Sequence, residues 1–155
     1  MPKSKKTSLD DLDRKILAIL MENAKTSYAE IGKKLLVSAG TVHVRIKKME
    51  ALGIIKGQVL LVDPQQLGFD ICAFLGIYLE RNSLYDEVAS LIEKIPEVVE
   101  AHYTTGMYSV FLKIVCKDTR HLRQVLHDKI QRIPGIQRTE TFISLEESIN
   151  RPLSL

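Results

Sequence analysis

The sequence predicts an α+β fold in which an N-terminal helix-turn-helix of three helices precedes a C-terminal ferredoxin-like domain with the order βαββαβ. Two observations lead to this prediction. Apolar residues recur with helical spacing up to residue 52, and after residue 69 strand-like and helical segments alternate. The alternating part also repeats itself after 38 residues. These patterns predict two domains, at residues 9–54 and 69–155.

The composition is that of a folded protein without a membrane segment. Of the 155 residues 45% are hydrophobic, and no apolar run approaches the roughly 20 residues that a membrane span needs. The basic start of the chain lacks the apolar stretch of a signal peptide. Cys72 and Cys116 lie inside apolar, strand-like runs, as the buried thiols of a cytosolic protein do. We therefore expect a cytoplasmic protein that does not bind membranes.

The charge is distributed unevenly along the chain. Residues 1–58 hold 12 Lys and Arg against 6 Asp and Glu, a net charge of +6, whereas residues 59–155 hold 10 against 13, a net charge of −3. Together they give the +3 of the whole chain. A basic N-terminal half on an acidic remainder is typical of a DNA-binding module attached to a regulatory domain.

The N-terminal domain should contain three helices, at about residues 10–22, 28–36 and 39–52. In the third helix Val42, Ile46 and Met49 form one apolar stripe, and Ser38 stands where an N-cap is needed. Gly53 then ends the helix. Three short helices around a small core, the third of them basic, form the minimal DNA-binding unit.

The stretch from Tyr28 to Lys48 indicates DNA binding. The face of the third helix opposite its apolar stripe is small and polar near its start and cationic near its end, so small side chains can meet base edges while lysines meet phosphates. A helical hairpin with solvated lysines is the alternative, because helix-turn-helix patterns are loose. His43 and Arg45 sit at the sides of the helix, within reach of phosphate or of a neighbouring carboxylate. The candidate DNA-binding residues are Tyr28, Ser38, Gly40, Thr41, His43, Val44, Arg45, Lys47 and Lys48.

Two segments lie outside the predicted domains. Residues 1–8 are polar and should form a flexible tail. Residues 55–68 should link the domains through a strand and a turn, because Gln58–Val62 is β-prone and Asp63 and Pro64 follow it.

The repeat places the elements of the C-terminal domain. Helix 84–95 leads into Ile95-Pro96, and 38 residues later helix 122–133 leads into Ile133-Pro134. Two tandem βαβ units therefore follow one another, which is the ferredoxin-like arrangement. The expected order is strand 70–80, helix 84–95, strand 98–105, strand 108–117, helix 119–133 and strand 136–146.

Alternation along the strands predicts an apolar outer face. In this topology both helices cover the same side of the sheet, so the other side would expose Phe74, Tyr78, Phe111 and Val115. An exposed apolar patch of this kind is typical of an oligomer interface. We therefore expect a homodimer formed through the sheet, whose two-fold symmetry suits a palindromic operator.

Enzymatic and metal-sensing functions find little support. A ferredoxin-like acylphosphatase needs a Gly-rich phosphate loop, whereas the turn after the first strand contains Asn82 and Ser83, which look like caps for the next helix. The sequence shows no Ser/His/Asp or Cys/His constellation, so no catalytic residue is expected. The four histidines and two cysteines lack metal-ligand spacing, so no metal is expected either.

Four segments give the chain a resemblance to the Lrp/AsnC ("feast/famine") transcription regulators, in order and over residues 9 to about 147. They are Leu12–Leu17, Val37–Arg45, Gly53–Ile55 and Tyr103–Ser109. The resemblance is greatest to the asparagine-responsive AsnC branch. It implies a winged-type helix-turn-helix, a C-terminal ligand domain, and dimers that assemble into octamers of four dimers. Two departures are Ala39, where many members have Pro, and Ser109, where many leucine- or lysine-type members have Asp.

The resemblance also implies a small amino acid as effector, bound near the loop Tyr103–Ser109, which would otherwise be read as a plain hairpin turn. Exposed backbone N–H groups at Gly106 can take the carboxylate, and hydroxyls can accept from the ammonium. The resemblance adds Gln131, Thr139 and Glu140, whose polarity favours asparagine; glutamine, or a hydrophobic amino acid such as leucine or methionine, is the alternative. The candidate effector-binding residues are Tyr103, Thr104, Thr105, Gly106, Met107, Tyr108, Ser109, Gln131, Thr139 and Glu140.

The sequence thus predicts a regulator that binds double-stranded DNA and a small amino acid and uses no cofactor. A rival from another class is an amino-acid-binding regulatory subunit that does not bind DNA. The basic N-terminal domain argues against this rival.

Overall fold

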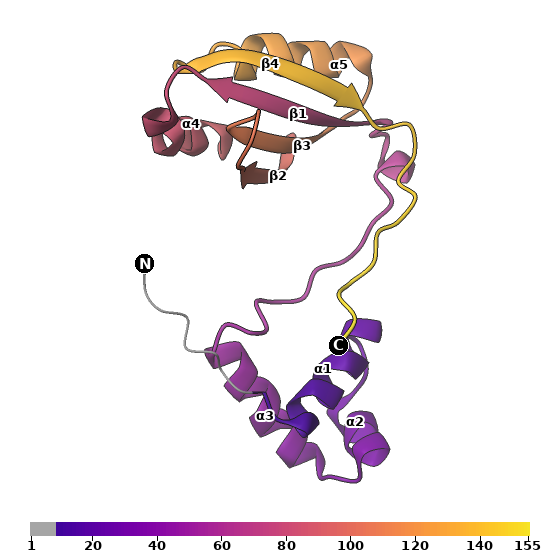
Figure 1. Cartoon of the computed structure of the whole chain (residues 1–155). Coiled ribbons are helices and arrows are strands. Elements are labelled where there is room, and N and C mark those ends of the chain that lie inside the picture. Colours follow the sequence, from indigo (N-terminus) through magenta and orange to yellow (C-terminus); the bar gives the residue numbers. More distant parts are fainter. Residues whose placement is uncertain (1–8) are drawn as a thin grey trace. The chain divides into compact units, whose positions relative to one another are not determined.

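The computed structural model describes residues 9–155, which form two compact units (Figure 1). One unit extends to Leu61 and includes Asn150–Leu155, and the other comprises Val62–Ile149. The tail predicted at residues 1–8 lies outside the described residues.

The N-terminal unit consists of three helices: α1 (Asp11–Glu22), α2 (Tyr28–Leu35) and α3 (Ala39–Ala51). Each helix begins at a side-chain cap. The carboxylate of Asp10 and the hydroxyls of Ser27 and Ser38 each accept a hydrogen bond from a backbone N–H in the first turn. The caps of α1 and α2 are reciprocal capping boxes, with Asp13 and Glu30 as the returning carboxylates. Local sequence therefore fixes where all three helices start.

A small apolar core joins these helices. Ile16 of α1, Ile31 of α2 and three residues of α3 are at most 3% exposed, and the three of α3 are the predicted stripe Val42, Ile46 and Met49. Leu17 completes the set at 8%. Because all three helices contribute to this core, displacing any one of them would expose apolar side chains of the other two.

The predicted linker strand is absent. Between α3 and the sheet the described residues contain only a short 3₁₀ turn, Gln65–Leu67, and no strand. Residues Val59, Leu60 and Leu61 are each more than 80% exposed. A strand requires a ladder partner for its backbone groups, and none of the described residues pairs with this segment. The wing implied by the family resemblance is therefore not formed within residues 9–155 either.

The C-terminal unit has the predicted βαββαβ order (Figure 1). Its four strands are antiparallel in the order β2-β3-β1-β4. The helices α4 and α5 are shorter than predicted, because α4 follows a 3₁₀ turn and α5 passes into a π-helical segment. The elements are β1 (Ile71–Leu79), the 3₁₀ turn Asn82–Leu84, α4 (Tyr85–Ile92), β2 (Val98–Tyr103), β3 (Val110–Cys116), α5 (Thr119–Gln124), the π-helical segment Val125–Ile130 and β4 (Ile136–Ile143).

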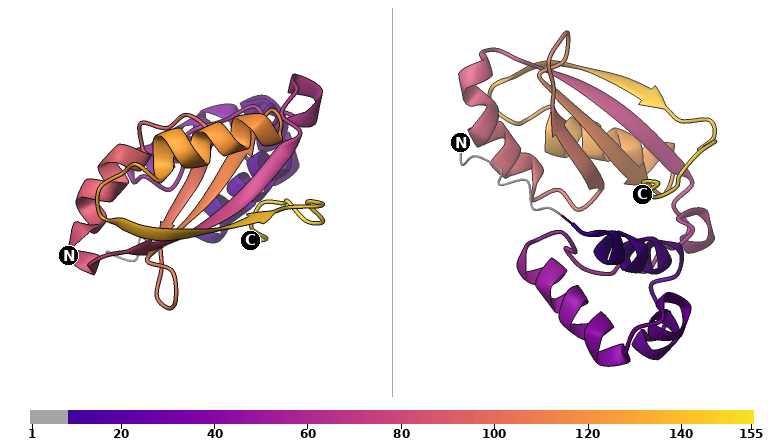
Figure 2. Two further views of the ribbon diagram at one scale, coloured as in Figure 1. Left: turned by 90° about the horizontal axis from the view of Figure 1, so that it is seen from above. Right: turned by 60° about the horizontal axis from the view of Figure 1, so that its bottom comes forward.

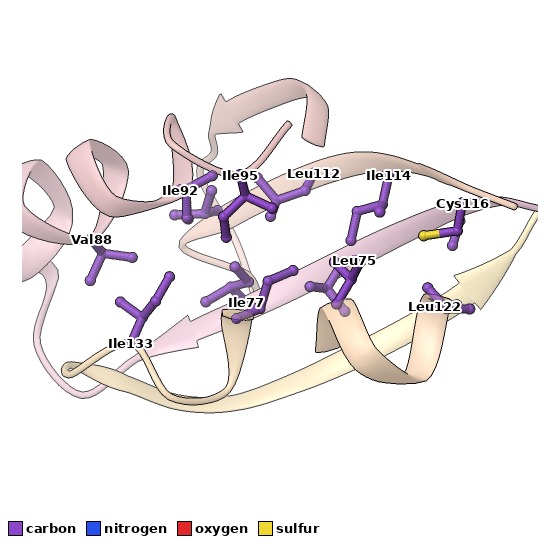
Figure 3. Close-up of a cluster of buried hydrophobic side chains, with 14 of the residues drawn as sticks. Leu75, Ile77, Val88, Ile92, Ile95, Leu112, Ile114, Cys116, Leu122 and Ile133 are labelled. Carbon is purple, nitrogen blue, oxygen red and sulfur yellow. The ribbon is translucent and has the colours of Figure 1, made fainter. Parts of the chain in front are cut away.

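Both helices cover one face of this sheet (Figure 2). Leu75 and Ile77 of β1 lie in one buried cluster with Val88 of α4 and Leu122 of α5 (Figure 3). The predicted alternation is confirmed, because Leu75 and Ile77 are 0% exposed whereas their neighbour Phe74 is only half-buried.

The opposite, outer face of the sheet carries aromatic rings. Phe74 and Phe111 stack with their ring centroids 5.9 Å apart, and Tyr78 and Tyr108 meet edge to face at 5.2 Å.

No helix of residues 9–155 is long and apolar enough to cross a membrane.

Candidate DNA-binding and effector-binding sites

The surface of α3 away from the core carries the predicted pattern. Ser38 Oγ accepts from the backbone N–H of Thr41 at 3.0 Å and lies 2.9 Å from Thr41 Oγ1, so the cap also orients the threonine. Gly40 is exposed, and Val44 is 65% exposed. The start of α3 thus presents small side chains at its outer surface.

Arg45 is engaged within the unit. Its guanidinium forms ion pairs with Asp10 and with Asp13, the latter at 3.1 Å between Nη1 and Oδ1. The hydrogen bond to Asp10 raises the pKa of Arg45, and the same bond lowers the pKa of Asp10 below its usual value. Of the two partners foreseen for Arg45, phosphate and carboxylate, the structure shows the carboxylates.

Two lysines near the end of α3 remain largely exposed. The side chains of Lys47 and Lys48 are 61% and 53% exposed. Lys47 Nζ lies 2.8 Å from Glu50 Oε2, a pair that is solvated and easily exchanged. Lys48 Nζ is 3.9 Å from Asp13 Oδ2. These ammonium groups are therefore free to exchange their carboxylate partners for phosphates.

Tyr28 and His43 connect the two helices of the motif. Their ring centroids lie 5.6 Å apart, and Tyr28 is 37% exposed. The tyrosine at the start of α2 and the histidine in α3 therefore form one surface next to Val44.

The sequence analysis did not identify Gly32, which lets α2 approach the backbone of the turn before α3 closely. A Cβ at Gly32 would lie 2.7 Å from the carbonyl oxygen of Val37, a backbone atom that cannot swing away. Between them Leu36 has φ 58° and ends α2 in the left-handed region, with its side chain 93% exposed. The signal was available in the sequence as a glycine inside a helix, at a position where propensity disfavours it.

The loop between β2 and β3 carries most of the predicted effector residues. It is closed by the backbone N–H of Thr104, which donates to Ser109 O at 3.1 Å, and by Thr104 Oγ1, which donates to Tyr108 O at 2.6 Å. Gly106 has φ 112°, a conformation that side chains rarely allow, and nothing lies within 4 Å of its Cβ position. The tip of the loop is therefore open to an approaching molecule.

Ser109 anchors this loop to β1 and to the 3₁₀ turn that precedes α4. Its backbone N–H donates to Ile77 O at 2.8 Å, and its hydroxyl donates to Asn82 Oδ1 at 3.2 Å. The expectation that Asn82 and Ser83 cap the following helix was wrong, because neither side chain caps the 3₁₀ turn or α4. The amide of Asn82 joins the loop instead, and sequence spacing gave no hint of that contact.

Glu140 accepts from two tyrosines on the outer face of the sheet. Tyr108 Oη donates to Glu140 Oε2 at 2.8 Å, and Tyr78 Oη donates to Oε1 at 3.2 Å. The bond to the carboxylate, together with partial burial, raises the pKa of the Tyr108 hydroxyl. Arg138 lies over the Tyr78 ring at 3.9 Å and pairs with Glu140 at 3.4 Å.

Gln131 and Thr139 lie on the other side of the sheet. Thr139 stands opposite Ile77 in the β1–β4 pairing, whereas Glu140 stands opposite Gly76, so Thr139 shares the helix-covered face. Gln131 Nε2 donates to Thr139 Oγ1 at 3.3 Å. A single chain therefore does not bring Glu140 and Thr139 into one pocket.

The remaining effector candidates lie at or next to the loop. Tyr103 stacks on Tyr85 of α4 with ring centroids 4.2 Å apart and is 54% exposed. Thr105 is exposed, and Met107 is 72% exposed.

The described residues contain no group of three or more His, Cys, Asp or Glu side chains arranged to hold a metal ion. Both cysteines are free thiols. Burial raises the pKa of Cys116 to about 11, so this thiol stays protonated and unreactive at neutral pH.

Comparison with known proteins identifies the family. A model of the AsnC-type helix-turn-helix domain matches residues 9–50, and a model of the Lrp/AsnC ligand-binding domain matches residues 72–153. The regulatory protein AsnC of Haemophilus influenzae is 47% identical over 146 residues, which cover 94% of this chain and 97% of that protein. The chain belongs to the Lrp/AsnC family.

Solved structures agree with this assignment. The structure of Escherichia coli AsnC matches with a TM-score of 0.90 and 46% identity, and covers 94% of this chain and 98% of that one. A transcriptional regulator of Neisseria meningitidis in complex with L-methionine matches with a TM-score of 0.87 and covers 93% and 94%; at 23% identity it shows the fold alone. The predicted fold class is confirmed. The Lrp/AsnC protein described here is a DNA-binding transcription regulator and not an enzyme.

Proposed function

We propose that this Lrp/AsnC protein adjusts its DNA binding to asparagine, bound at the loop Thr104–Ser109. The open, glycine-containing tip of that loop is the observation that carries the proposal. The family's ligand-binding domain accounts for an amino-acid effector in general, whereas the choice of asparagine rests on the polarity of the loop.

The two charged ends of an amino acid need opposite partners. Near Gly106 the backbone can present N–H groups to a carboxylate without a Cβ in the way. Thr105 supplies an exposed hydroxyl, whereas Thr104 and Ser109 use theirs to hold the loop. The tip of the loop therefore offers backbone N–H groups and the hydroxyl of Thr105 to the ligand, which favours a side chain able to form hydrogen bonds.

Methionine is the second candidate. Met107 is 72% exposed, and the Neisseria regulator was solved with L-methionine. A flexible thioether at the loop would pack on an apolar ligand as readily as on a polar one.

Isothermal titration calorimetry with the whole protein tests these ligands. Asparagine should bind more tightly than glutamine, methionine or leucine. Gly106→Val should lose asparagine binding and still bind DNA, because valine disfavours φ 112° and fills the approach. Gly68→Val is the matched control, since Gly68 also has positive φ and open space but lies outside the loop. Tighter binding of methionine or leucine to the wild type would sink the assignment to asparagine.

For DNA we propose that the start of α3 enters the major groove. Ser38, Gly40, Thr41 and Val44 would then face base edges, and Lys47 and Lys48 would meet phosphates. Replacing both lysines by Ala should weaken binding to all sequences and reduce the slope of log K against log salt by about 2. Thr41→Ala should instead change sequence preference and leave that slope unaltered. A double lysine variant with the wild-type slope would show that this docking is wrong.

We further propose a homodimer formed through the outer face of the sheet, with four dimers in an octamer. The partly exposed stack of Phe74 and Phe111 supports a covered face. The mass in solution tests this: a wild type that stays monomeric at micromolar concentration contradicts the dimer. We propose that this DNA-binding regulator acts in the cytoplasm. We also propose that its two domains comprise residues 9–54 and 69–155.

A further inference from the structure

We propose that Glu140 is a positioning residue for the effector loop and not itself a ligand of the amino acid. It holds the side chain of Tyr108, and Tyr108 in turn sets the conformation of the loop Thr104–Ser109. The inference rests on the proposed function, because it takes this loop as the effector site. Its test includes a measurement without ligand, so the two proposals can fail separately.

The ring of Tyr108 occupies the place of a missing side chain on β1. A Cβ built at Gly76 would lie 2.7 Å from Cγ of this ring and closer still to two other ring carbons, so only glycine leaves room for it. In the strand pairing Gly76 stands between Phe111 of β3 and Glu140 of β4, and it is buried although it belongs to the outer face. The Tyr108 ring therefore covers the middle of the sheet, beside Glu140.

Three aromatic neighbours surround this ring. Its centroid lies 5.2 Å from that of Tyr78, 5.8 Å from that of Phe111 and 6.4 Å from that of Phe142. These distances fall in the range in which aromatic pairs attract one another. Because the ring is held from several sides, the hydroxyl of Tyr108 meets Glu140 in a defined position.

Both oxygens of the Glu140 carboxylate already have partners. Oε2 accepts from Tyr108 Oη at 2.8 Å, whereas Oε1 accepts from Tyr78 Oη at 3.2 Å and lies 3.4 Å from Arg138 Nη2. The ammonium of an amino acid would have to compete with these groups for the carboxylate. A role as the anchor of Tyr108 accounts for the bond at Oε2 without any ligand.

The backbone of Tyr108 closes the effector loop. Its carbonyl oxygen accepts from Thr104 Oγ1 at 2.6 Å, and the backbone N–H of Thr104 donates to Ser109 O at 3.1 Å. A shift of the Tyr108 ring therefore moves the carbonyl group on which Thr104 closes the loop. The open tip at Gly106 lies between these two anchoring points. One side chain thus connects Glu140 on the sheet to the tip of the loop.

This connection determines how much of the protein has a loop ready for the ligand. When the bond to Glu140 is lost, other loop conformations gain population, and the apparent Kd rises by the inverse of the competent fraction. Glu140 then affects the affinity without touching the ligand. A direct contact would behave differently, because loss of the carboxylate would weaken binding whatever the state of Tyr108.

Isothermal titration calorimetry of the whole protein with L-asparagine tests the positioning role. Tyr108→Phe keeps the ring, removes the hydroxyl and should raise the Kd about five- to tenfold. Glu140→Ala should raise it by a similar factor, and the double variant no further, because both changes remove the same bond. Glu140→Gln should keep most of the affinity, since its amide oxygen still accepts from Tyr108. Tyr78→Phe is the matched control, because it removes the other hydroxyl from the carboxylate outside the loop, and its Kd should equal that of the wild type.

Hydrogen exchange without ligand gives a second readout, which does not depend on the identity of the effector. The backbone amides of residues 103–109 should exchange about five- to tenfold faster in Tyr108→Phe and in Glu140→Ala than in the wild type, and Tyr78→Phe should match the wild type. Gly76→Ala displaces the ring itself and should accelerate the exchange of the same amides. Circular dichroism and sedimentation velocity check that each variant keeps the fold and the mass of the wild type.

The outcomes separate the two proposals. A wild type that does not bind asparagine overturns the proposed effector, and hydrogen exchange alone then decides the positioning role. Tyr108→Phe with wild-type exchange, or with the wild-type Kd for asparagine, overturns the positioning role and leaves the effector site standing. Additive losses in the double variant, or Glu140→Gln that binds as weakly as Glu140→Ala, assign the carboxylate to the ligand and also overturn it.

Discussion

The two units of the molecule are stabilised in different ways. Among the described residues the N-terminal unit buries six apolar side chains, and the C-terminal unit buries fifteen in one cluster. The smaller unit gains further stability from three side-chain caps and from the ion pairs of Arg45 with Asp10 and Asp13. The larger one has a four-stranded sheet with two helices on it.

The difference follows from what each surface must do. A unit that meets a polyanion needs cations near its recognition helix, and their mutual repulsion destabilises a small fold. Asp13, at 1% exposure, offsets that repulsion, because it pairs with Arg45 and lies 3.9 Å from Lys48. The inner face of the sheet does not have to present cations to a polyanion, and it is filled mainly with aliphatic side chains.

The largest effect is expected from truncating a side chain in the small core of the N-terminal unit. Ile31→Ala is expected to cost 2–5 kcal/mol. A unit of about 50 residues has roughly 2.5–7.5 kcal/mol in total, at 0.05–0.15 kcal/mol per residue, so most of its stability would go. Leu112→Ala removes a similar volume from the larger core and should leave that unit folded. Thermal unfolding followed by circular dichroism, with a gel shift and amino-acid calorimetry, measures both; loss of effector binding in Ile31→Ala would argue against independent units.

A smaller effect should come from the turn of the helix-turn-helix. Gly32→Ala places a methyl group 2.7 Å from Val37 O, and relief of that clash should cost about 1–3 kcal/mol and shift α3. Gly40→Ala is the matched control, because its Cβ meets only Ser38 Oγ at 3.7 Å. It should keep or raise stability through better helix propensity. Equal stability of the two variants would mean that the close approach at Gly32 is easily relieved.

The sequence predicted the elements that depend on local signals. The start of α3 after Ser38 follows from capping chemistry, and the inner face of β1 follows from alternation. The repeat of Ile95-Pro96 at Ile133-Pro134 gave the topology, because each proline follows the end of a helix.

Features that depend on distant partners were not predictable in this way. The strand expected at Gln58–Val62 has suitable residues but no ladder partner in the described chain. The contact of Asn82 with Ser109 joins residues 27 apart in sequence. The separation of Thr139 from Glu140, in contrast, follows from alternation along β4, so the expectation that both line one pocket of a single chain could have been corrected from the sequence. Arg45 was predicted to reach either phosphate or a carboxylate, and only three-dimensional placement chose between them.

An effect of similar size should come from a charged cluster in the C-terminal unit. Burial alone would raise the pKa of Glu97, but hydrogen bonds from Lys129 Nζ at 2.6 Å and from His121 Nε2 at 3.1 Å help to hold this pKa below its usual 4.5. A carboxyl group whose pKa is lower in the folded state stabilises the fold above the unfolded pKa, and this contribution is lost as pH falls through the folded value.

Glu97→Gln should therefore lower the free energy of unfolding of the C-terminal unit by about 1–3 kcal/mol at pH 7, because a neutral amide is a poorer acceptor for Lys129. The difference between variant and wild type should shrink as pH falls below 4.5, since protonation removes the same charge from the wild type. Urea unfolding at pH 7, 5, 4 and 3 measures this, with Glu93→Gln, an exposed carboxylate of the same unit, as control. A difference that stays constant over that range would show that packing around Glu97, and not its charge, stabilises the unit.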